Sequence, residues 1–176
     1  MPDLPEAQRD ALTRLKYGPA TKTLLQFNRA AWRRTGKPRA CATDLGVGAV
    51  WDAGENQSGP KGMLAVLAGG GASTATRSLL KTGGADQMVS HLSFFGIGRA
   101  RLVASHSVSW EDDPWARGAY AVFDRFFPPA ARRLLKMPSG RIFFAGEHTS
   151  AKWQGYMNGA ITSGQRVAEE IAALFL

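Results

Sequence analysis

Residues 141–164 read RIFFAGEHTSAKWQGYMNGAITSG and combine a short apolar run, a polar turn and a segment rich in small residues. Its apolar residues 142–145 predict a short buried strand, and the residues from about 156 to 175 predict an amphipathic helix. Gly146 and Glu147 follow the end of that strand, where α/β folds bind ligands, and the helix start offers unpaired N–H groups that suit an anion. The stretch therefore predicts a ligand site, while a capping role for Glu147 and plain helix–helix packing of the small residues fit the same pattern.

The rest of the chain predicts a mixture of helices and strands. The predicted helices lie at 5–16 and 72–92, the second broken at Gly83-Gly84, and the predicted strands lie at 21–27, 63–68 and 102–110, with a β-like island at 46–51. Because these elements alternate without regular βαβ spacing, the order predicts an α+β fold or a piece of a larger α/β protein.

The charge balance restricts the classes of partner. There are 22 Lys and Arg against 14 Asp and Glu, which gives a net charge of +8. Such an excess fits nucleic acid, an acidic ligand or an acidic partner surface. The basic residues are scattered in short pairs and match no nucleic-acid-binding module, so we expect no nucleic-acid partner.

Cysteine content and hydropathy suggest where the chain works. Cys41 is the only cysteine, which excludes an intrachain disulfide and a zinc cluster built from thiolates. No apolar run is long enough for a membrane span, and the first ten residues contain no apolar signal core. The sequence thus predicts a soluble, cytoplasmic chain that binds neither a metal nor a membrane.

Three segments carry a resemblance to a known family. GRIFFAGEHTSAKWQGYMNGAITSGQRVAEEI, residues 140–171, resembles the C-terminal signature of the flavin-containing amine oxidases, which include monoamine, polyamine and L-amino-acid oxidases. SVSWEDDPWARGAYAVF, residues 107–123, resembles the family's Trp-acid-x-x-Pro-(small)-x-Gly-x-Tyr segment. LKYGPATKTLLQF, residues 15–27, followed by AAW, resembles its substrate-domain strand that carries a lysine.

The resemblance covers roughly residues 4–171 and implies an α+β or α/β fold, the C-terminal part of an FAD-dependent amine oxidase. Residues 1–115 would form part of the substrate-binding domain, a mixed sheet plus helices. Residues 116–176 would form the C-terminal FAD-binding segment, with the last strand and helix of the FAD-binding domain.

The resemblance also implies roles for individual residues. Lys22 matches the lysine that holds a water against flavin N5 and assists reoxidation by oxygen; an ordinary exposed strand lysine is the alternative. Tyr120 and Tyr156 match two aromatic residues that flank the substrate amine. Glu147 matches the acid that binds the ribityl–pyrophosphate region of FAD, and the backbone N–H of Met157 matches the group that faces flavin O2.

Further residues of the matched segments bear on the cofactor. Gly146, Trp153 and Gly155 belong to the same implied cofactor-binding set as Glu147, Tyr156 and Met157. Some monoamine oxidases attach FAD through a cysteine where this chain has Ala119, so the resemblance implies noncovalent FAD. Asn158 stands where an acid is common in the family.

The family's phosphate-binding turn is not found in the sequence. No Gly-x-Gly-x-x-Gly turn follows an N-terminal strand, and GGG at 69–71 lacks that context. Three interpretations stay open: a part that needs an N-terminal FAD-binding half or chain, a truncated remnant without activity, and a non-catalytic binding or scaffold module that keeps the fold.

With the missing half present, the resemblance implies oxidative deamination of an amine by O2, with imine or carbonyl compound, ammonia and H2O2 as products. Primary amine, polyamine and amino acid stay open as substrates, and the two tyrosines favour an amine. Arg33 and Arg34 could bind an amino-acid carboxylate, although their loop-like segment favours solvation. Because the last helix would expose an apolar face without its partner, we expect the chain alone to be poorly soluble or a homodimer.

Overall fold

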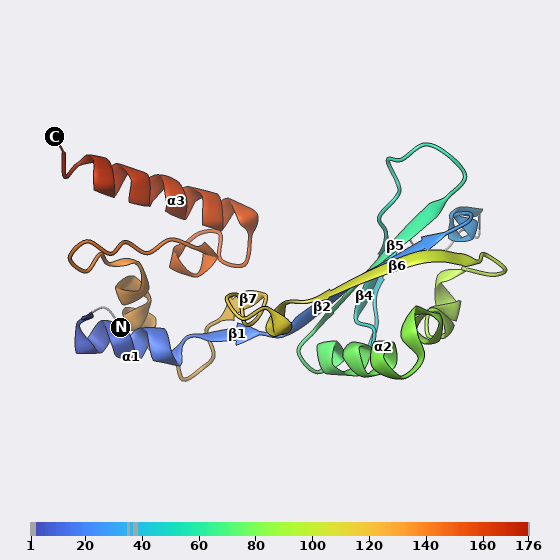
Figure 1. Ribbon diagram of the computed structural model, residues 1–176, viewed down its shortest axis with the longest axis horizontal. Helices are drawn as coiled ribbons and strands as arrows, with labels where there is room; N and C mark the ends of the chain where they lie inside the picture. Colours follow the sequence, from blue (N-terminus) through green and yellow to red (C-terminus); the bar gives the residue numbers. More distant parts are fainter. Residues whose placement is uncertain (1–2, 35, 37–38, 176) are drawn as a thin grey trace. The chain divides into compact units, whose positions relative to one another are not determined.

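The computed structural model describes residues 3–34, 36 and 39–175, and Figure 1 shows the arrangement of its elements. Contacts divide these residues into two compact units. Pro19–Ala119 form one, which we call the sheet unit; the residues up to Gly18 join those from Tyr120 onward in the other, the terminal unit. This division differs from the predicted boundaries 1–115 and 116–176, because the N-terminal helix packs with the C-terminal segment.

The sheet unit is built on a five-stranded antiparallel sheet with the strand order β3-β4-β5-β2-β6. The strands are β2 (Ala20–Phe27), β3 (Ala40–Ala42), β4 (Ala49–Asp52), β5 (Gly62–Gly69) and β6 (Leu102–Ser109). Along β2, Thr21, Thr23, Leu25 and Phe27 are buried while Lys22 between them is exposed. This alternation fits a strand with one face on the core and one face open. The predicted strands at 21–27, 63–68 and 102–110 are confirmed as β2, β5 and β6.

Helix α2 (Gly71–Ser90) lies along one face of this sheet (Figure 1). Gly84 has a φ of 63° and interrupts the helix, which confirms the predicted break. After α2, the chain continues through η2 (Ser93–Phe95) into β6. The core between helix and sheet is made of buried apolar residues of β2, β4, β5, α2, η2 and the turns beside them, which include Leu25, Phe27, Trp32, Val50, Leu64, Val66, Met88, Leu92 and Phe95.

A buried ion pair fixes the turn after β2. The turn η1 (Ala31–Arg34) buries Trp32, whose ring lies edge-to-face on Phe27 with 5.5 Å between centroids. Arg33 Nε and Nη2 donate to the two carboxylate oxygens of Asp52 at 2.7 and 3.1 Å, and the Asp52 side chain is fully buried. Burial raises the pKa of Asp52, but hydrogen bonds from Arg33, Trp32 and the Gly54 amide outweigh it and hold that pKa below its ordinary 3.8.

The terminal unit joins the two ends of the chain. Its elements are α1 (Glu6–Arg14), β1 (Lys16–Gly18), β7 (Tyr120–Val122), η4 (Pro129–Lys136), η5 (Glu147–Thr149) and α3 (Met157–Ala172). Strand β1 pairs antiparallel with β7, with Tyr17 opposite Ala121. The side chain of Gln8 donates to the carbonyls of Leu134 and Met137 at 3.0 and 2.6 Å, which fastens α1 to η4.

The predicted strand at 142–145 does not form. Among the described residues this segment makes only an isolated bridge, between Ser139 and Ile142. Its polar groups bond to α3 instead, since the Phe144 carbonyl accepts from Arg166 Nη2 at 2.6 Å and the Gly146 amide donates to Ser163 Oγ at 2.8 Å. An extended segment without a neighbouring strand has no ladder partner and is not a strand.

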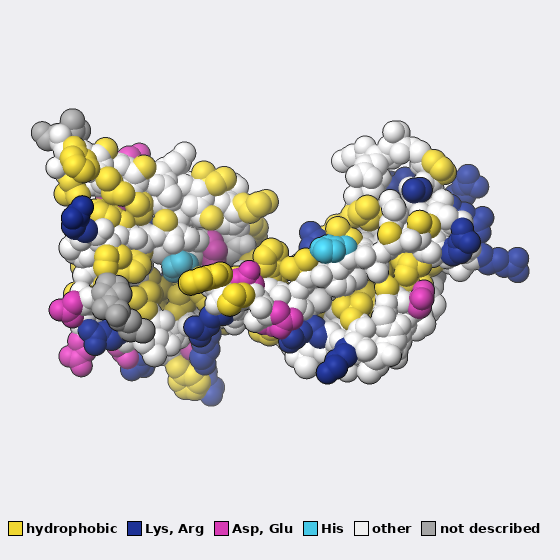
Figure 2. All heavy atoms as spheres, in the orientation of Figure 1, with side chains coloured by type: hydrophobic (Ala, Val, Ile, Leu, Met, Phe, Trp, Pro, Cys, Tyr) yellow, Lys and Arg dark blue, Asp and Glu magenta, His cyan; other side chains and the backbone are white. Residues whose placement is uncertain are grey.

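Helix α3 presents an apolar face to solvent. The predicted helix at about 156–175 is observed at Met157–Ala172. Hydrophobic residues are exposed along α3 and just after it: Met157, Ile161, Ile171, Leu174 and Phe175. Figure 2 shows hydrophobic side chains gathered over the helix. Within the described ranges, no helix combines the length and apolar character needed to cross a membrane.

Asp52→Ala removes the carboxylate that pairs with Arg33 and leaves that cation only the Gly54 carbonyl, so we expect a loss of about 3 kcal/mol of unfolding free energy, measured by urea denaturation at pH 7. Because the folded pKa of Asp52 is depressed, the pair's contribution is full above pH 3.8 and is lost as the pH falls through the folded pKa. Glu55→Ala, which breaks the exposed Arg39–Glu55 pair, is the control with a much smaller expected change. Equal losses in both variants contradict this account.

Candidate functional site

The loop 146–156 forms the entry to α3. Gly146 has a φ of 136°, a conformation that disfavours other residues, and its carbonyl accepts from Thr149 Oγ1 at 2.8 Å. Together with the bond from the Gly146 amide to Ser163, this ties both sides of Gly146 into the loop and helix. The glycine predicted to let a ligand approach thus also sets the path of the loop.

Glu147 is the central acceptor of the loop. Its Oε1 accepts from the Ala121 amide of β7 at 2.8 Å, and its Oε2 accepts from the Gly155 amide at 2.7 Å. Each carboxylate oxygen can accept a second hydrogen bond, so both keep capacity for a ligand. We call this pair of bonds the Glu147 clamp; it holds β7 and the start of α3 in one frame.

Aromatic side chains flank the start of α3. Tyr156 and Trp153 are 66% and 42% exposed, and their rings meet edge-to-face with centroids 6.2 Å apart. Met157, the first residue of α3, is 84% exposed. Amides in the first turn of a helix have no intrahelical acceptor and carry a partial positive charge. The arrangement offers a polar edge beside two aromatic faces.

Two glycines shape this entry. Gly155 has a φ of 79°, which favours glycine, and a Cβ there would meet nothing within 4 Å. Gly159 differs, because a Cβ would collide with the Trp153 carbonyl. Of the two, Gly159 therefore serves packing inside the chain, whereas Gly155 faces open space.

His148 and Tyr17 form a contact that sequence reasoning missed. Tyr17 Oη lies 2.9 Å from His148 Nδ1, and the rings meet edge-to-face. Burial lowers the pKa of His148 below 6.5, and the charge of Glu147 offsets only part of that shift. Burial, aided by Glu147, raises the pKa of Tyr17. A neutral His148 protonated on Nε2 accepts the Tyr17 hydroxyl hydrogen.

The other predicted residues fall in both units. Tyr120 lies in β7 of the terminal unit, is 45% exposed, and directly precedes Ala121, which the Glu147 clamp holds. Lys22 lies in the sheet unit on the sheet face opposite α2, with its side chain exposed and Nζ 5.7 Å from the ring centroid of Trp51. The structure thus links Tyr120 to Glu147 through Ala121, the next residue in the chain. Lys22 belongs to the sheet unit, which is described by itself.

Glu111 anchors the strand that carries Lys22. In η3 (Trp110–Asp112), Glu111 Oε1 accepts from Ser73 Oγ at 2.9 Å and Oε2 accepts from the Ala20 amide at 3.2 Å. Burial raises the pKa of Glu111, but these bonds and the charge of Arg77 hold it below its ordinary value. The acid of the sequence motif therefore fixes the start of β2. No local pattern reveals this, since its partners lie 38 and 91 residues away.

The family model of flavin containing amine oxidoreductases matches residues 1–172. The chain belongs to this family. Among curated relatives, it is 27% identical to the flavin-containing amine oxidase A of Sus scrofa and 28% identical to the flavin-containing amine oxidase B of Homo sapiens. The matches cover 97% of this chain but 33% and 34% of those proteins, so the chain spans about a third of their length.

Solved structures of amine oxidases share the fold. A cyclohexylamine oxidase from Brevibacterium oxydans superposes with a TM-score of 0.87 at 23% identity, over 99% of this chain and 39% of that one. A putrescine oxidase superposes with a TM-score of 0.81 at 22% identity, over 98% of this chain and 39% of that one. The mixed helix and sheet architecture of a flavin amine oxidase, present in part, is thereby confirmed.

Glu147→Gln leaves one acceptor oxygen where two amides need one each. We expect the Ala121 or Gly155 amide to exchange its hydrogen about tenfold faster, since an unpaired buried donor costs of the order of 1–3 kcal/mol. Hydrogen exchange followed by NMR measures this. Glu169→Gln, on the exposed side of α3, is the matched control. Unchanged protection of both amides in Glu147→Gln contradicts the clamp.

We expect His148 to titrate below pH 6.5. An NMR titration that follows its Cε1–H resonance measures the midpoint. The folded state disfavours the charged ring. The contribution of neutral His148 to the free energy of unfolding is therefore full above pH 6.5 and is lost as the pH falls through the lower folded pKa. Tyr17→Phe removes the donor to the neutral ring and should raise the midpoint. Tyr156→Phe is the control that leaves the midpoint in place. A wild-type midpoint above 6.5 contradicts this assignment.

Proposed function

We propose that this chain is the C-terminal part of an FAD-dependent amine oxidase that oxidatively deaminates a primary amine or amino acid with O2 as the electron acceptor. The observation that carries the proposal is the Glu147 clamp. It joins β7, which bears Tyr120, to the loop that ends at Tyr156. Both tyrosines assigned to the substrate therefore stand on one hydrogen-bonded frame.

The residues at the start of α3 fit a flavin ring edge. The first amides of the helix, at Met157 and Asn158, lack intrahelical acceptors and can donate to a carbonyl oxygen that gains negative charge. Gly155 leaves open space beside them, and Glu147 keeps acceptor capacity for hydroxyl groups. Ala119 has no thiol, so the proposed FAD is held noncovalently.

When bound, FAD would supply the two-electron oxidation of an amine with O2 as the final acceptor, in which amine, O2 and water give a carbonyl compound, ammonia and H2O2. The chain's own groups orient the reactants. Tyr120 and Tyr156 offer aromatic faces that favour a compact amine, with a cation–π term for a protonated one. Lys22 holds a water for the reaction with oxygen.

A dinucleotide-binding part must complete the site. The chain spans about a third of its curated relatives and contains no Gly-x-Gly-x-x-Gly turn. We infer that this part supplies the phosphate-binding turn and covers the apolar face of α3. Without that part, the apolar face of α3 is exposed to water. Because such exposure is unfavourable, the face is free to associate with another apolar surface.

Co-expression with a dinucleotide-binding part should give a complex that produces H2O2 with primary amines in a peroxidase-coupled assay. In that complex, Lys22→Met should slow flavin reoxidation by O2 about tenfold or more in stopped-flow absorbance, because the water loses its donor. Lys81→Met, on α2, is the matched control. A folded complex that binds FAD but oxidises no amine leaves the non-catalytic binding module as the function.

The chain alone should self-associate through α3. Light scattering after size exclusion should give a dimer or larger species at micromolar concentration. The double change Ile161→Gln and Phe175→Gln should shift it toward monomer, since both side chains are exposed on the helix region. Phe126→Gln removes an exposed aromatic elsewhere in the same unit and is the control. A monodisperse wild-type monomer contradicts this expectation.

A further inference from the structure

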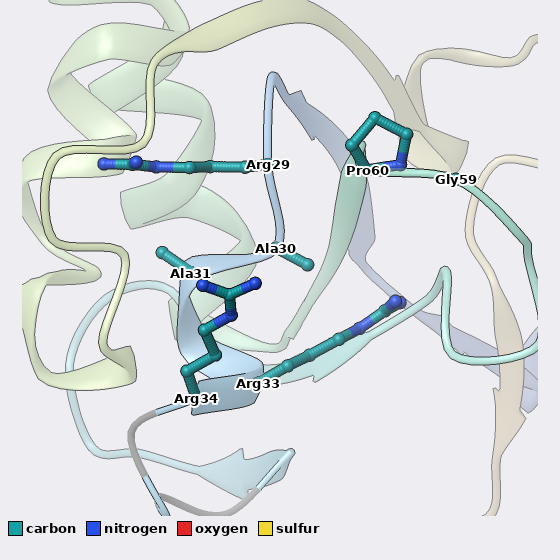
Figure 3. A pocket seen from close by; sticks show the side chains of 7 residues that line it. All are labelled: Arg29, Ala30, Ala31, Arg33, Arg34, Gly59 and Pro60. Carbon is teal, nitrogen blue, oxygen red and sulfur yellow. The ribbon is translucent and has the colours of Figure 1, made fainter.

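A pocket with an arginine-rich wall lies beside the turn after β2. Its volume is about 540 Å³, and Figure 3 shows the residues that line it: Arg29, Ala30, Ala31, Arg33, Arg34, Gly59 and Pro60. In this view Arg29 and Arg33 extend to opposite sides, and Arg34 lies between them. Apart from the sequence-based suggestion that Arg33 and Arg34 bind an amino-acid carboxylate, none of these residues has a role in the proposed oxidase site.

The charge at this pocket is unbalanced. Residues 28–40 contain five basic residues and no acidic one. Arg33 is neutralised by Asp52 and also donates to the Gly54 carbonyl, and Arg39 pairs with Glu55. Arg29 and Arg34 are exposed and form no ion pair within the described ranges. Figure 2 shows Lys and Arg side chains gathered at this end of the sheet unit, so the pocket presents an uncompensated positive field.

The pocket is held in shape before any ligand arrives. Trp32, which lies between Arg29 and Arg34 in the sequence, is buried in the core. The Arg33–Asp52 ion pair fixes the turn to β4. Donors on a rigid turn lose less conformational entropy on binding than donors on a mobile loop. Arg29 and Arg34 therefore start from a preformed backbone.

The lining suits carboxylates of a protein segment. A guanidinium presents a planar fork that matches a carboxylate, and the other described lining residues are two alanines, Gly59 and Pro60. Among the described lining residues none is aromatic, so none can stack on a nucleic-acid base. None of them has a bulky apolar side chain that could enter a bilayer.

We propose that this pocket docks an acidic segment of a partner protein, with Asp or Glu carboxylates on Arg29 and Arg34. The segment lies against Ala30, Ala31 and Pro60, and Arg33 serves the turn rather than the ligand. This surface is independent of the proposed amine oxidation, because it uses no residue assigned to the flavin or to the substrate amine.

Fluorescence anisotropy with labelled octaglutamate and the whole chain tests the proposal. The double change Arg29→Gln and Arg34→Gln should weaken binding about five- to tenfold, given the modest strength of exposed ion pairs. The pair Lys81→Gln and Arg141→Gln removes the same charge from exposed positions outside the pocket and should change binding less than twofold. Affinity should fall as salt rises. Because both arginines are exposed, circular dichroism should show an unchanged fold.

Three outcomes overturn the proposal. In one, both double variants lose affinity equally, so that only net charge matters. In another, octaglutamate leaves the amide NMR signals of residues 29–34 and 59–60 unshifted. In the third, phosphatidylserine vesicles or an RNA octamer bind more tightly than octaglutamate, with the same dependence on Arg29 and Arg34.

Discussion

Two hydrogen bonds to one carboxylate hold the candidate site together. Glu147 accepts from Ala121 in β7 and from Gly155 at the entry of α3, at 2.8 and 2.7 Å. A bond to a charged acceptor is stronger than a neutral one, so the carboxylate can set the spacing of two segments that share no ladder. Tyr120 on one side and Tyr156 with Met157 on the other depend on that spacing.

The surroundings of the clamp depend on contacts of the same kind. Ser163 accepts from the Gly146 amide, Arg166 reaches the Phe144 carbonyl, and Tyr17 lies against His148. These bonds give the segment 142–149 polar partners in α3 and β1. The sheet unit has its own anchors, Glu111 at the start of β2 and Asp52 beyond its end. Each unit thus uses carboxylates that accept backbone or arginine donors to hold its segments in place.

The sequence predicted the elements whose patterns are local. The β-prone residues of β2, the alternating residues of β6 and the apolar spacing of α3 were readable, as was the break at Gly84. The prediction of a strand at 142–145 was wrong, because an apolar run predicts a strand whether or not a neighbouring strand is present. The pairing of β1 with β7 and both bonds of Glu111 join residues far apart in sequence, so no window reveals them. Glu147 was singled out for a ligand or a helix cap, and its bond to the Ala121 amide of β7 was not foreseen.

The Glu147 clamp is proposed to form the flavin-facing wall of an amine oxidase. The most direct measurement is the dissociation constant of FAD for the chain complexed with a dinucleotide-binding part, with wild-type Glu147 and with Glu147→Ala, from flavin absorbance and fluorescence. The account predicts a wild-type complex that retains FAD and a variant that binds it at least tenfold more weakly, in line with the loss of two charge-assisted hydrogen bonds. Equal affinity in both complexes, or no flavin in the wild-type complex, would contradict it.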